Sequence, residues 1–285
     1  MDKEQQAIER LKLAAMMSET YYHKPVLICY SGGKDSDVLL ELAQRSGIRY
    51  EVEHSLTTVD APETVYHVRD KFRQLEEAGV SCRIKHPEMT MWQLIVHRKI
   101  LPTRRIRYCC AELKETNGDG RHIVTGVRWA ESTRRRNARG VQESFEDKDK
   151  KIILTNDNDD KRLLTERCQM RAKTITNPII DWEDSDIYSY IDQEHICINP
   201  LYCQGFPRVG CIGCPMAGRR ARELEFERYP TYKKAYITAI GKMIKAREAA
   251  GLKPFAPRTA QGMFDWWMET GILDGQLKLE MDQDE

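Results

Sequence analysis

The stretch 26-VLICYSGGKDSDVLL-40 decides the fold of this chain. It begins with an apolar run, residues 26–30, which is typical of a buried strand, and it ends with an amphipathic run from Val38, which is typical of a helix. The six residues between them therefore form a strand-to-helix turn. Such a turn binds phosphate in α/β proteins, because glycines let the backbone approach an anion and a helix N-terminus presents free N–H groups.

The side chains of this turn add hydrogen-bond donors and a metal ligand. Lys34 and the serine hydroxyls can donate to phosphate, and Asp35 is a candidate Mg²⁺ ligand. We expect Lys34 and Asp35 to face solvent. The spacing does not fit a Walker A loop, and the alternative is that the two glycines merely make a turn. The predicted phosphate-binding residues are Ser31, Gly32, Gly33, Lys34, Asp35 and Ser36.

Strands and helices alternate on both sides of the turn. After an amphipathic helix at about residues 2–18, the pattern predicts strands at 25–30, 48–52, 80–85 and 122–127, and helices at 34–45, 62–78, 88–100 and 181–193. This alternation predicts a doubly wound parallel sheet. The charged segment 140–172 is predicted to be a surface hairpin, with its turn at 156–160, or a partly mobile insertion. We expect one α/β domain over residues 1–220 and a helical extension over 221–285.

Charge and composition exclude some classes of protein. The 45 Lys and Arg residues nearly balance the 44 Asp and Glu residues, so the net charge of +1 gives no overall attraction to nucleic acid. Two basic clusters, residues 98–107 and 134–139, are either solvated faces or parts of a cleft for an anionic substrate. No apolar stretch has the length of a membrane-spanning helix, and residues 1–4 do not start a secretory signal. We expect a cytoplasmic protein with no membrane partner.

The chain has nine cysteines, which is an odd number, and no export signal. Both observations favour reduced or metal-bound thiols over disulfides. Four of them, Cys29, Cys82, Cys168 and Cys197, fit apolar positions of strands and helices. The other five, which are the candidate metal ligands, are Cys109, Cys110, Cys203, Cys211 and Cys214. Four thiolates suit zinc or a four-iron cluster, but an adjacent Cys-Cys pair is awkward for a closed zinc site. The alternative is a chance group of unligated thiols.

Three segments resemble known enzyme signatures. The turn resembles the SGGxDS signature of the PP-loop ATP pyrophosphatases, which cleave ATP between its α and β phosphates and transiently attach AMP to an acceptor. Segment 107-RYCCAELK-114 resembles the R-x-C-C-x-x-x-K segment of sulfonucleotide reductases, and 126-GVRWAESTRR-135 resembles their G-x-R-x-x-E-S-x-x-R segment. With residues 178–182 and 199–215, the chain is identified as a member of the phosphoadenosine phosphosulfate (PAPS) reductase-like family of that Rossmann-like superfamily.

The resemblance implies roles for particular residues. Lys34 and Arg128 would neutralise charge as pyrophosphate leaves, and with Asp35 they are the expected catalytic residues. Asp60 matches a second nucleotide-contacting loop and would hold the ribose or the metal. The further residues expected to contact the nucleotide are Gly126, Arg128, Glu131 and Ser132.

The resemblance leaves two sets of cluster ligands open. The iron-sulfur branch of the family implies that a 4Fe-4S cluster is held by Cys109, Cys110, Cys211 and Cys214. The ATP pyrophosphatase branch of bacterial DNA phosphorothioation implies Cys203, Cys211 and Cys214 with one cysteine of the earlier pair. The chain is closest in pattern to this second branch, so the set with Cys203 is favoured, and zinc is the less favoured metal.

Two departures from the sulfonucleotide reductases favour ATP as the substrate. The tail, residues 277–285, lacks the Glu-Cys-Gly-Leu/Ile-His motif of those enzymes, and the turn keeps an intact SGGKDS where theirs is degenerate. The chain is therefore predicted to be an ATP- and Mg²⁺-dependent sulfur-transfer enzyme that adenylylates an acceptor. We expect a nucleic-acid acceptor, a sulfur donor such as a cysteine desulfurase, and a homodimer. The alternatives are an APS or PAPS reductase and a nucleotide-binding subunit of a sulfate-activating complex.

Overall fold

The computed structural model describes residues 2–114, 118, 120–147, 150–157 and 173–269. The chain divides into two compact units, each with its own internal contacts. Unit 1 comprises residues 1–55, 62–85 and 116–209, and unit 2 comprises residues 56–61, 86–115 and 210–285. Unit 2 is thus assembled from three segments. The predicted domain boundary at residue 220 stays a prediction.

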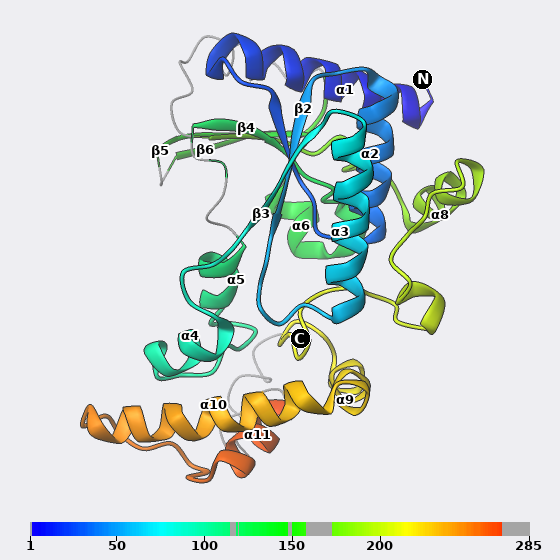
Figure 1. Cartoon of the computed structure of the whole chain (residues 1–285). Helices are drawn as coiled ribbons and strands as arrows, with labels where there is room; N and C mark the ends of the chain where they lie inside the picture. The colour runs from blue at the N-terminus through cyan, green and yellow to red at the C-terminus, as the bar shows by residue number, and fades with distance from the viewer. Residues whose placement is uncertain (1, 115–117, 119, 148–149, 158–172, 270–285) are drawn as a thin grey trace, which may run out of the picture. The chain divides into compact units, whose positions relative to one another are not determined.

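A seven-stranded sheet of order β3-β2-β1-β4-β7-β5-β6 forms the centre of unit 1 (Figure 1). Its first five strands in that order are parallel, and β5 pairs antiparallel with both β7 and β6. This arrangement confirms the predicted doubly wound, mostly parallel α/β fold. The strands are β1 Val26–Cys29, β2 Tyr50–Ser55, β3 Ser81–Lys85, β4 Arg121–Val124, β5 Gln142–Asp147, β6 Lys150–Leu154 and β7 Lys173–Thr176.

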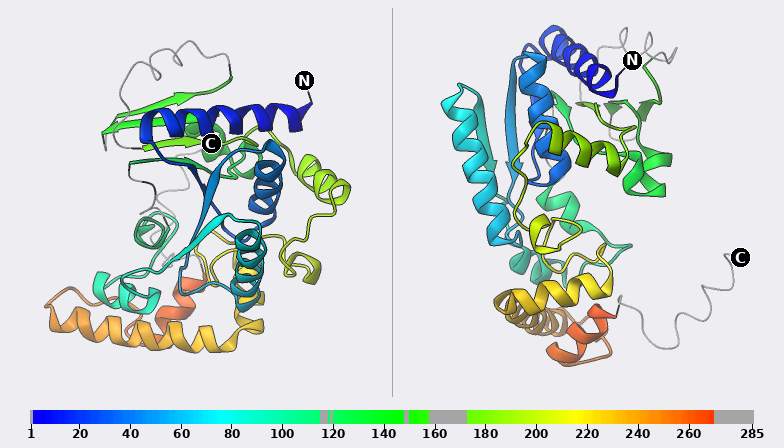
Figure 2. Two further views of the ribbon diagram at one scale, coloured as in Figure 1. Left: turned by 45° about the horizontal axis from the view of Figure 1, so that its top comes forward. Right: turned by 90° about the vertical axis from the view of Figure 1, so that its right-hand side faces the viewer.

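Helices pack on this sheet through a shared apolar core. α2 and α3 each connect neighbouring parallel strands, and right-handed crossovers place both on one face. α1 lies against α2 and β4 (Figure 2). The core contains Leu11 of α1, Leu39 of α2, Phe72 of α3 and Ile187 of α8. The helices of unit 1 are α1 Lys3–Met17, α2 Lys34–Ser46, α3 Pro62–Glu77, α6 Thr133–Ala138 and α8 Asp184–Gln193, with a π-helical turn at Ser18–Tyr22 and 3-10 turns at Trp129–Glu131 and Tyr202–Gln204.

The charged segment after residue 140 differs from the prediction. β5 and β6 do form a hairpin, but β5 also pairs with β7, with Gln142 opposite Thr176 and Ser144 opposite Thr174. The hairpin therefore extends the main sheet instead of forming a separate surface insertion. β5 ends at Asp147 and β6 begins at Lys150, so the turn predicted at 156–160 is not the turn of this hairpin. Residues 158–160 of that predicted turn lie outside the described residues.

Unit 2 is helical, and α10 is its longest helix. α10 contacts α4, α9 and α11 (Figure 2). Phe226, Tyr236 and Trp267 are buried and pack ring against ring, so these aromatic side chains belong to the core of unit 2. Its helices are α4 Met91–Arg98, α5 Tyr108–Leu113, α9 Arg219–Arg228, α10 Pro230–Ala249 and α11 Ala260–Met268. In the described part of the chain, no helix combines the length and the apolar character that crossing a membrane requires.

Candidate functional site

The turn between β1 and α2 has the geometry predicted for residues 31–36. Gly33 is the N-cap of α2, and its N–H donates to Ser36 Oγ over 3.1 Å. Ser36 Oγ donates in turn to the Gly33 carbonyl over 2.7 Å, and Ser31 Oγ donates to Ser36 Oγ over 3.2 Å. Hydrogen bonds of the two serine hydroxyls therefore stabilise the conformation of the turn.

Gly32 is the position where this turn requires glycine. Its φ is +74°, a left-handed conformation that a side chain strains. A Cβ atom there would also lie 3.0 Å from methyl groups of Thr64 and Val68 on α3. The turn thus packs closely against α3, and this packing requires that residue 32 has no side chain.

A segment far along the sequence fastens the turn. Asn199, which is fully buried, donates from Nδ2 to the Gly32 carbonyl and to Thr64 Oγ1, each over 3.1 Å. The Lys34 amide donates to the Tyr202 hydroxyl over 3.2 Å, and burial raises the pKa of Tyr202 to about 12. Neither residue was a predicted site residue, although both lie in a segment that carries the family resemblance.

Two cations and two carboxylates lie at the start of α2. Arg128 Nε donates to Asp35 Oδ1 over 2.7 Å, and its Nη2 donates to Asp184 Oδ1 over 2.6 Å. Lys34 Nζ lies 3.2 Å from Asp35 Oδ1 and 3.4 Å from the same Asp184 oxygen. The structure therefore brings the predicted catalytic residues Lys34, Asp35 and Arg128 together, and it adds Asp184.

The environment of Lys34 corrects one expectation. Lys34 is buried, whereas the sequence predicted a solvent-facing side chain. Its amine also lies 5.3 Å from the ring centre of Tyr188 on α8. The residues that enclose this lysine come from α8, more than 140 positions along the chain, so local sequence gave no sign of the burial.

The predicted segment 126–132 contacts the turn through its first residues. A Cβ atom on Gly126 would lie 3.1 Å from the Asp35 carbonyl oxygen, so β4 leads directly to the start of α2. Glu131 instead accepts a hydrogen bond from the Arg128 amide over 3.0 Å, and Ser132 Oγ accepts one from the Arg135 amide over 3.2 Å. The nucleotide contacts of Glu131 and Ser132 stay predictions.

A buried polar group lies behind the turn and was not predicted. Asp37 is buried and accepts hydrogen bonds from the Tyr30 hydroxyl over 2.6 Å. His67 Nε2 lies 3.0 Å from the same carboxylate oxygen. Burial and the Asp37 charge raise the pKa of Tyr30, so its hydroxyl stays protonated and donating. This network joins β1, α2 and α3 and stabilises the first turn of α2.

Asp60 belongs to unit 2 and not to the unit that carries the phosphate turn. It forms a single antiparallel bridge with Cys211, and its Oδ2 accepts from the Thr57 amide over 2.7 Å. Its carbonyl accepts from the Tyr232 hydroxyl over 2.9 Å. Asp60 thus supports the loop that carries Cys211, and its predicted contact with a nucleotide or metal stays a prediction.

Four of the five candidate ligand thiols belong to unit 2. Cys109 and Cys110 begin α5, and Cys211 and Cys214 lie on the loop before α9. All four are half-buried and reduced, and the charges of Cys211 and Cys214 act on Cys109. The fifth, Cys203, is exposed on a 3-10 turn of unit 1.

Hydrogen bonds and cations act on these thiols. A hydrogen bond with Cys109 lowers the pKa of Cys110, and Arg107 Nη2 donates to the Cys110 sulfur over 3.4 Å. The charge of Cys211 raises the pKa of Lys114. Two cations therefore favour the thiolate form that metal binding requires. Across the described ranges, no three His, Cys, Asp or Glu side chains lie close enough to hold a metal ion.

The thiols predicted to be structural have mixed surroundings. Cys29 packs against the core of β1, β4 and β7, and burial raises its pKa to about 11. Cys82 is half-buried on β3. Cys197 is exposed, so the prediction of an apolar position was wrong for it, because the segment after α8 runs along the surface. Cys168 lies outside the described residues.

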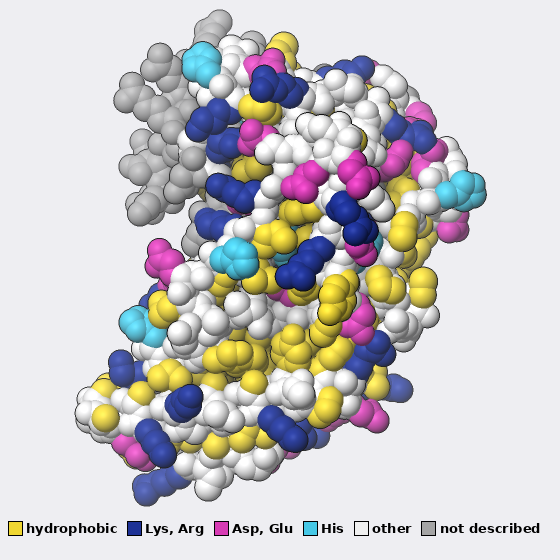
Figure 3. Space-filling view, viewed as in Figure 1, with side chains coloured by type: hydrophobic (Ala, Val, Ile, Leu, Met, Phe, Trp, Pro, Cys, Tyr) yellow, Lys and Arg dark blue, Asp and Glu magenta, His cyan; other side chains and the backbone are white. Residues whose placement is uncertain are grey.

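The two predicted basic clusters fall in different units. Arg104 and Arg107 are in unit 2, where Arg104 Nε donates to the Pro215 carbonyl over 3.2 Å. Arg135 is in unit 1 and pairs with Glu131, while Arg136 is exposed. On the face in Figure 3, Lys and Arg side chains are interspersed with Asp and Glu. A nucleic-acid partner stays a prediction.

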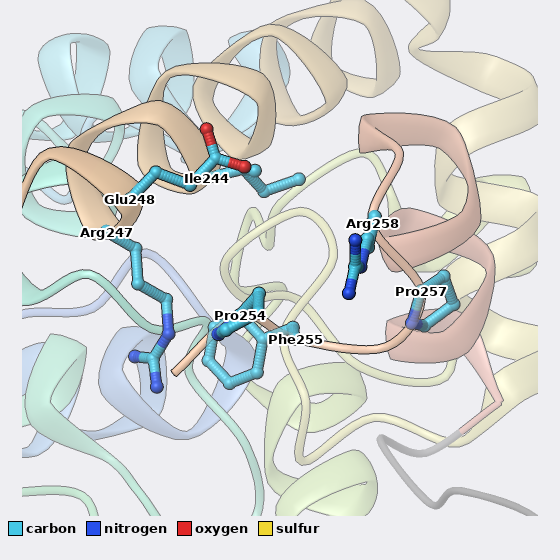
Figure 4. A pocket seen from close by; sticks show the side chains of 7 residues that line it. All are labelled: Ile244, Arg247, Glu248, Pro254, Phe255, Pro257 and Arg258. Atoms are coloured by element: carbon cyan, nitrogen blue, oxygen red, sulfur yellow. The ribbon is translucent and has the colours of Figure 1, made fainter. Parts of the chain in front are cut away.

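A small pocket in unit 2 does not fit a substrate. Arg247 covers the Phe255 ring at 3.9 Å from its centre, and the rest of the lining is formed by Ile244, Glu248, Pro254, Pro257 and Arg258 (Figure 4). Its volume of about 10 Å³ leaves space for one water molecule. The chain therefore has two candidate sites, which are the turn of unit 1 and, separately, the thiols of unit 2.

Comparison with known proteins gives a family match and several relatives. Residues 25–217 match the phosphoadenosine phosphosulfate reductase domain. An adenosine 5'-phosphosulfate reductase of Rhodococcus opacus (strain B4) is 29% identical over 192 residues, which are 62% of this chain and 64% of the relative. The matches span between 36% and 64% of the length of three curated relatives.

Two solved structures are also similar. A PAPS reductase from Candida auris in a phosphate complex has a TM-score of 0.47 and 16% identity, and the match covers 72% of this chain and 88% of that one. A U34-tRNA thiolase from Methanococcus maripaludis, solved with its 4Fe-4S cluster, has a TM-score of 0.39 and 11% identity, with 87% and 82% of the two chains covered.

Proposed function

The chain belongs to the phosphoadenosine phosphosulfate reductase domain family, and from that premise we propose that it is an ATP-dependent sulfur-transfer enzyme of the PP-loop type. One observation carries the proposal. The intact 31-SGGKDS-36 turn starts a helix, and two buried cations, Lys34 and Arg128, lie beside its aspartate. Such a turn suits a polyphosphate, because a helix N-terminus and fixed cations both favour negative charge.

In the proposed first step, an acceptor oxygen attacks the α-phosphorus of ATP. The bond from that phosphorus to the bridging oxygen breaks, and pyrophosphate leaves while the acceptor keeps AMP. Lys34 and Arg128 neutralise the charge that develops on the leaving group, and Asp35 is the residue that would hold a Mg²⁺ ion, which would add further positive charge there. Because both cations are already fixed by ion pairs, little reorganisation is needed when ATP binds.

The thiols of unit 2 support the second half of the proposal. Cys109, Cys110, Cys211 and Cys214 supply four sulfur donors from one compact unit, and Lys114 carries a compensating charge. Four thiolates match the ligand number of a 4Fe-4S cluster, which would supply a site for sulfur or electrons in the later transfer, and the described side chains would have to move closer together to hold it. The set with Cys203, which the motif pattern favours, and the set Cys109, Cys110, Cys211 and Cys214 both stay candidates for the ligands.

The acceptor and the donor of sulfur complete the proposal. By its motif pattern, the chain is nearest to the ATP pyrophosphatase branch of DNA phosphorothioation, so the acceptor is a nucleic-acid oxygen. The sulfur donor is a persulfide-forming enzyme such as a cysteine desulfurase. Contacts with nucleic-acid phosphates would make binding weaken steeply with added salt, and affinity for DNA and tRNA at two salt concentrations tests this part.

The test of the first step is release of pyrophosphate together with transfer of AMP from ATP to the nucleic acid. Purified protein is incubated with ATP, Mg²⁺ and nucleic acid, and Lys34→Ala is compared with the exposed-lysine control Lys24→Ala. We expect Lys34→Ala to lower turnover by about 10²- to 10³-fold, as the loss of one preorganised cation does. Lys24→Ala should match wild type. Wild-type turnover in Lys34→Ala, at unchanged thermal stability, would contradict the ATP site.

A reductase is the second candidate function. The observation that favours it is the likeness to the R. opacus relative, which is named an adenosine 5'-phosphosulfate reductase. Under this alternative, the protein would bind an adenylyl sulfate and release sulfite when a thiol reductant is present. Tight binding of adenosine 5'-phosphosulfate without any ATP-dependent release of pyrophosphate would favour the reductase.

A further inference from the structure

Asp184 is the member of the ion-pair network that no motif indicates. It is the first residue of α8, and its Oδ1 lies 2.6 Å from Arg128 Nη2 and 3.4 Å from Lys34 Nζ. The Arg128 side chain is 2% exposed and that of Asp184 is 69% exposed. A surface carboxylate thus reaches two cations that are themselves buried.

This geometry is the one in which an oxygen of a phosphate binds. An oxyanion between an ammonium and a guanidinium group accepts charge-assisted hydrogen bonds from both, whether it belongs to a carboxylate or to a phosphate. Asp35 also contacts both cations, but it lies within the turn itself. Asp184 comes from another element, so its carboxylate can be exchanged for a ligand without altering the turn.

The anchoring of α8 permits such an exchange. Ile187 and Ile191 are buried in the core of unit 1, so the helix axis stays in place. On the outer side, Tyr188 is exposed, and its ring lies 5.3 Å from Lys34 Nζ. Rotation of the Asp184 side chain alone would leave Asp35 as the remaining carboxylate partner of the two cations and would open the position of the Asp184 oxygen to a ligand.

The charges of the network balance in the nucleotide-free protein. Lys34 and Arg128 carry two positive charges, and Asp35 and Asp184 carry two negative charges. The hydrogen bond from Arg128 lowers the pKa of Asp184, so this carboxylate is ionised at neutral pH. A phosphate group that replaced Asp184 would restore the balance.

We propose that Asp184 is an internal competitor for the phosphate-binding site, which a polyphosphate displaces on binding and which returns as pyrophosphate leaves. This inference rests on the proposed function, because it takes the turn as the site of ATP. Asp184 is then a positioning residue that sets the affinity for pyrophosphate and helps its release. It takes no part in the chemical step.

The experiment measures binding of inorganic pyrophosphate by calorimetry without Mg²⁺, with the full chain. Asp184→Asn keeps the size of the side chain but removes its charge, and we expect the Kd to fall about fivefold, since an exposed ion pair contributes little more. Pyrophosphate should also inhibit AMP formation by this variant at a correspondingly lower concentration. The matched control is Asp192→Asn, an exposed carboxylate in the last turn of the same helix, and its Kd should equal that of wild type.

Other results would overturn the inference in distinguishable ways. If wild type binds pyrophosphate and ATP but Asp184→Asn binds them equally well or more weakly, the competitor role fails and the proposed ATP site stands. A loss of affinity that occurs only with Mg²⁺ would show that Asp184 holds the cation instead. If neither protein binds pyrophosphate or ATP, the proposed function fails and this inference fails with it.

Discussion

The phosphate turn of unit 1 and the thiol region of unit 2 differ in how completely the protein alone holds them. In the turn, Gly32, Gly33, Lys34 and Ser36 have hydrogen-bond partners in place, and Asn199 fastens the turn to α3. In the thiol region the backbone of the Cys211 loop is also held, because Ile212 N–H donates to the Val59 carbonyl over 2.8 Å and Gly213 N–H donates to Glu225 Oε2 over 2.6 Å. The groups of the turn that would contact a ligand are fixed by other side chains, whereas the sulfur atoms would be fixed further by the metal that they bind.

This difference explains why the two regions need different experiments. A preorganised site keeps its shape when one ligand-binding side chain is removed, so loss of function there reports chemistry. A site ordered by a metal loses its shape with the metal, because binding energy is also folding energy. Substitution of a ligand-binding residue in unit 1 should therefore lower activity without lowering stability. Substitution of a metal ligand in unit 2 should lower both.

The largest expected effect is loss of the metal from unit 2. Protein purified without oxygen should contain about four iron and four sulfide per chain, as expected for a thiolate-held cluster. Cys211→Ser should remove the iron and the brown colour and should make the loop before α9 more sensitive to protease. Iron analysis, absorbance and limited proteolysis measure the three changes.

Two control variants sharpen this prediction. Cys29→Ala should keep the iron, because Cys29 packs in the sheet of unit 1. Lys34→Ala should also keep the iron while losing AMP formation, which separates the two regions within one protein. Stoichiometric zinc without sulfide, or a Cys211→Ser protein that keeps its iron, would refute the cluster.

A pair of glycine substitutions gives an intermediate effect. Gly213 has a φ of +72°, and a Cβ atom there would lie 2.6 Å from Phe226 Cζ in the core of unit 2. We expect Gly213→Ala to lower the free energy of unfolding by about 3 kcal/mol, from backbone strain and overpacking. Gly32→Ala, whose Cβ would lie 3.0 Å from two methyl groups, should cost about 2 kcal/mol and also weaken ATP binding.

The control for strain alone is Gly79→Ala. Its φ is +85° and nothing lies within 4 Å of the added atom, so about 1 kcal/mol is expected. Urea unfolding measures all three variants. An equal decrease in the free energy of unfolding for the three variants would show that close packing around the turn and around the thiol loop does not contribute to the cost of the substitution.

An effect that is small near neutral pH and grows in acid is a loss of stability in unit 1. His122 is fully buried, its Nε2 lies 2.8 Å from Thr176 Oγ1, and burial lowers its pKa to about 3. The unfolded chain, with a His pKa of about 6.5, binds more protons than the folded protein between those two values. The free energy of unfolding should therefore fall as the pH drops from about 6.5 towards 3, by at most about 1.4 kcal/mol per pH unit.

His122→Gln should flatten this pH dependence, whereas the exposed-residue control His86→Gln should leave it unchanged. Urea unfolding at pH 7 and pH 5, with hydrogen exchange to assign the loss to unit 1, is the measurement. A pH dependence that is the same in wild type and in His122→Gln would contradict the assignment.

The features that the sequence predicted correctly are those that local patterns of residues determine. The turn at 31–36 follows from two glycines between an apolar run and an amphipathic run, and both flanking elements are confirmed. α8 begins at Asp184, three residues later than predicted, because residues 177–182 form turns after β7. Local periodicity fixes the type of an element better than its ends.

The sequence did not predict contacts between distant segments. Asp184 has the ordinary character of an acidic residue in the first turn of a helix, so nothing marks its contact with Lys34. The burial of Lys34 and the hydrogen bonds of Asn199 and Tyr202 depend in the same way on tertiary packing. The pairing of β5 with β7 joins segments about 30 residues apart, and strand alternation alone does not choose a partner.

The order of the sheet has a consequence for self-association. Among the strands that the structure describes, β3 and β6 lie at the edges of the sheet, and an edge strand offers unpaired backbone groups to another chain. Both edges carry charge, with Arg83 exposed on β3 and Lys151 on β6. Adding a strand from a second copy would bring like charges together and bury them. A homodimer of this protein would therefore use a surface other than the sheet edges, and the same charges protect the sheet from aggregation.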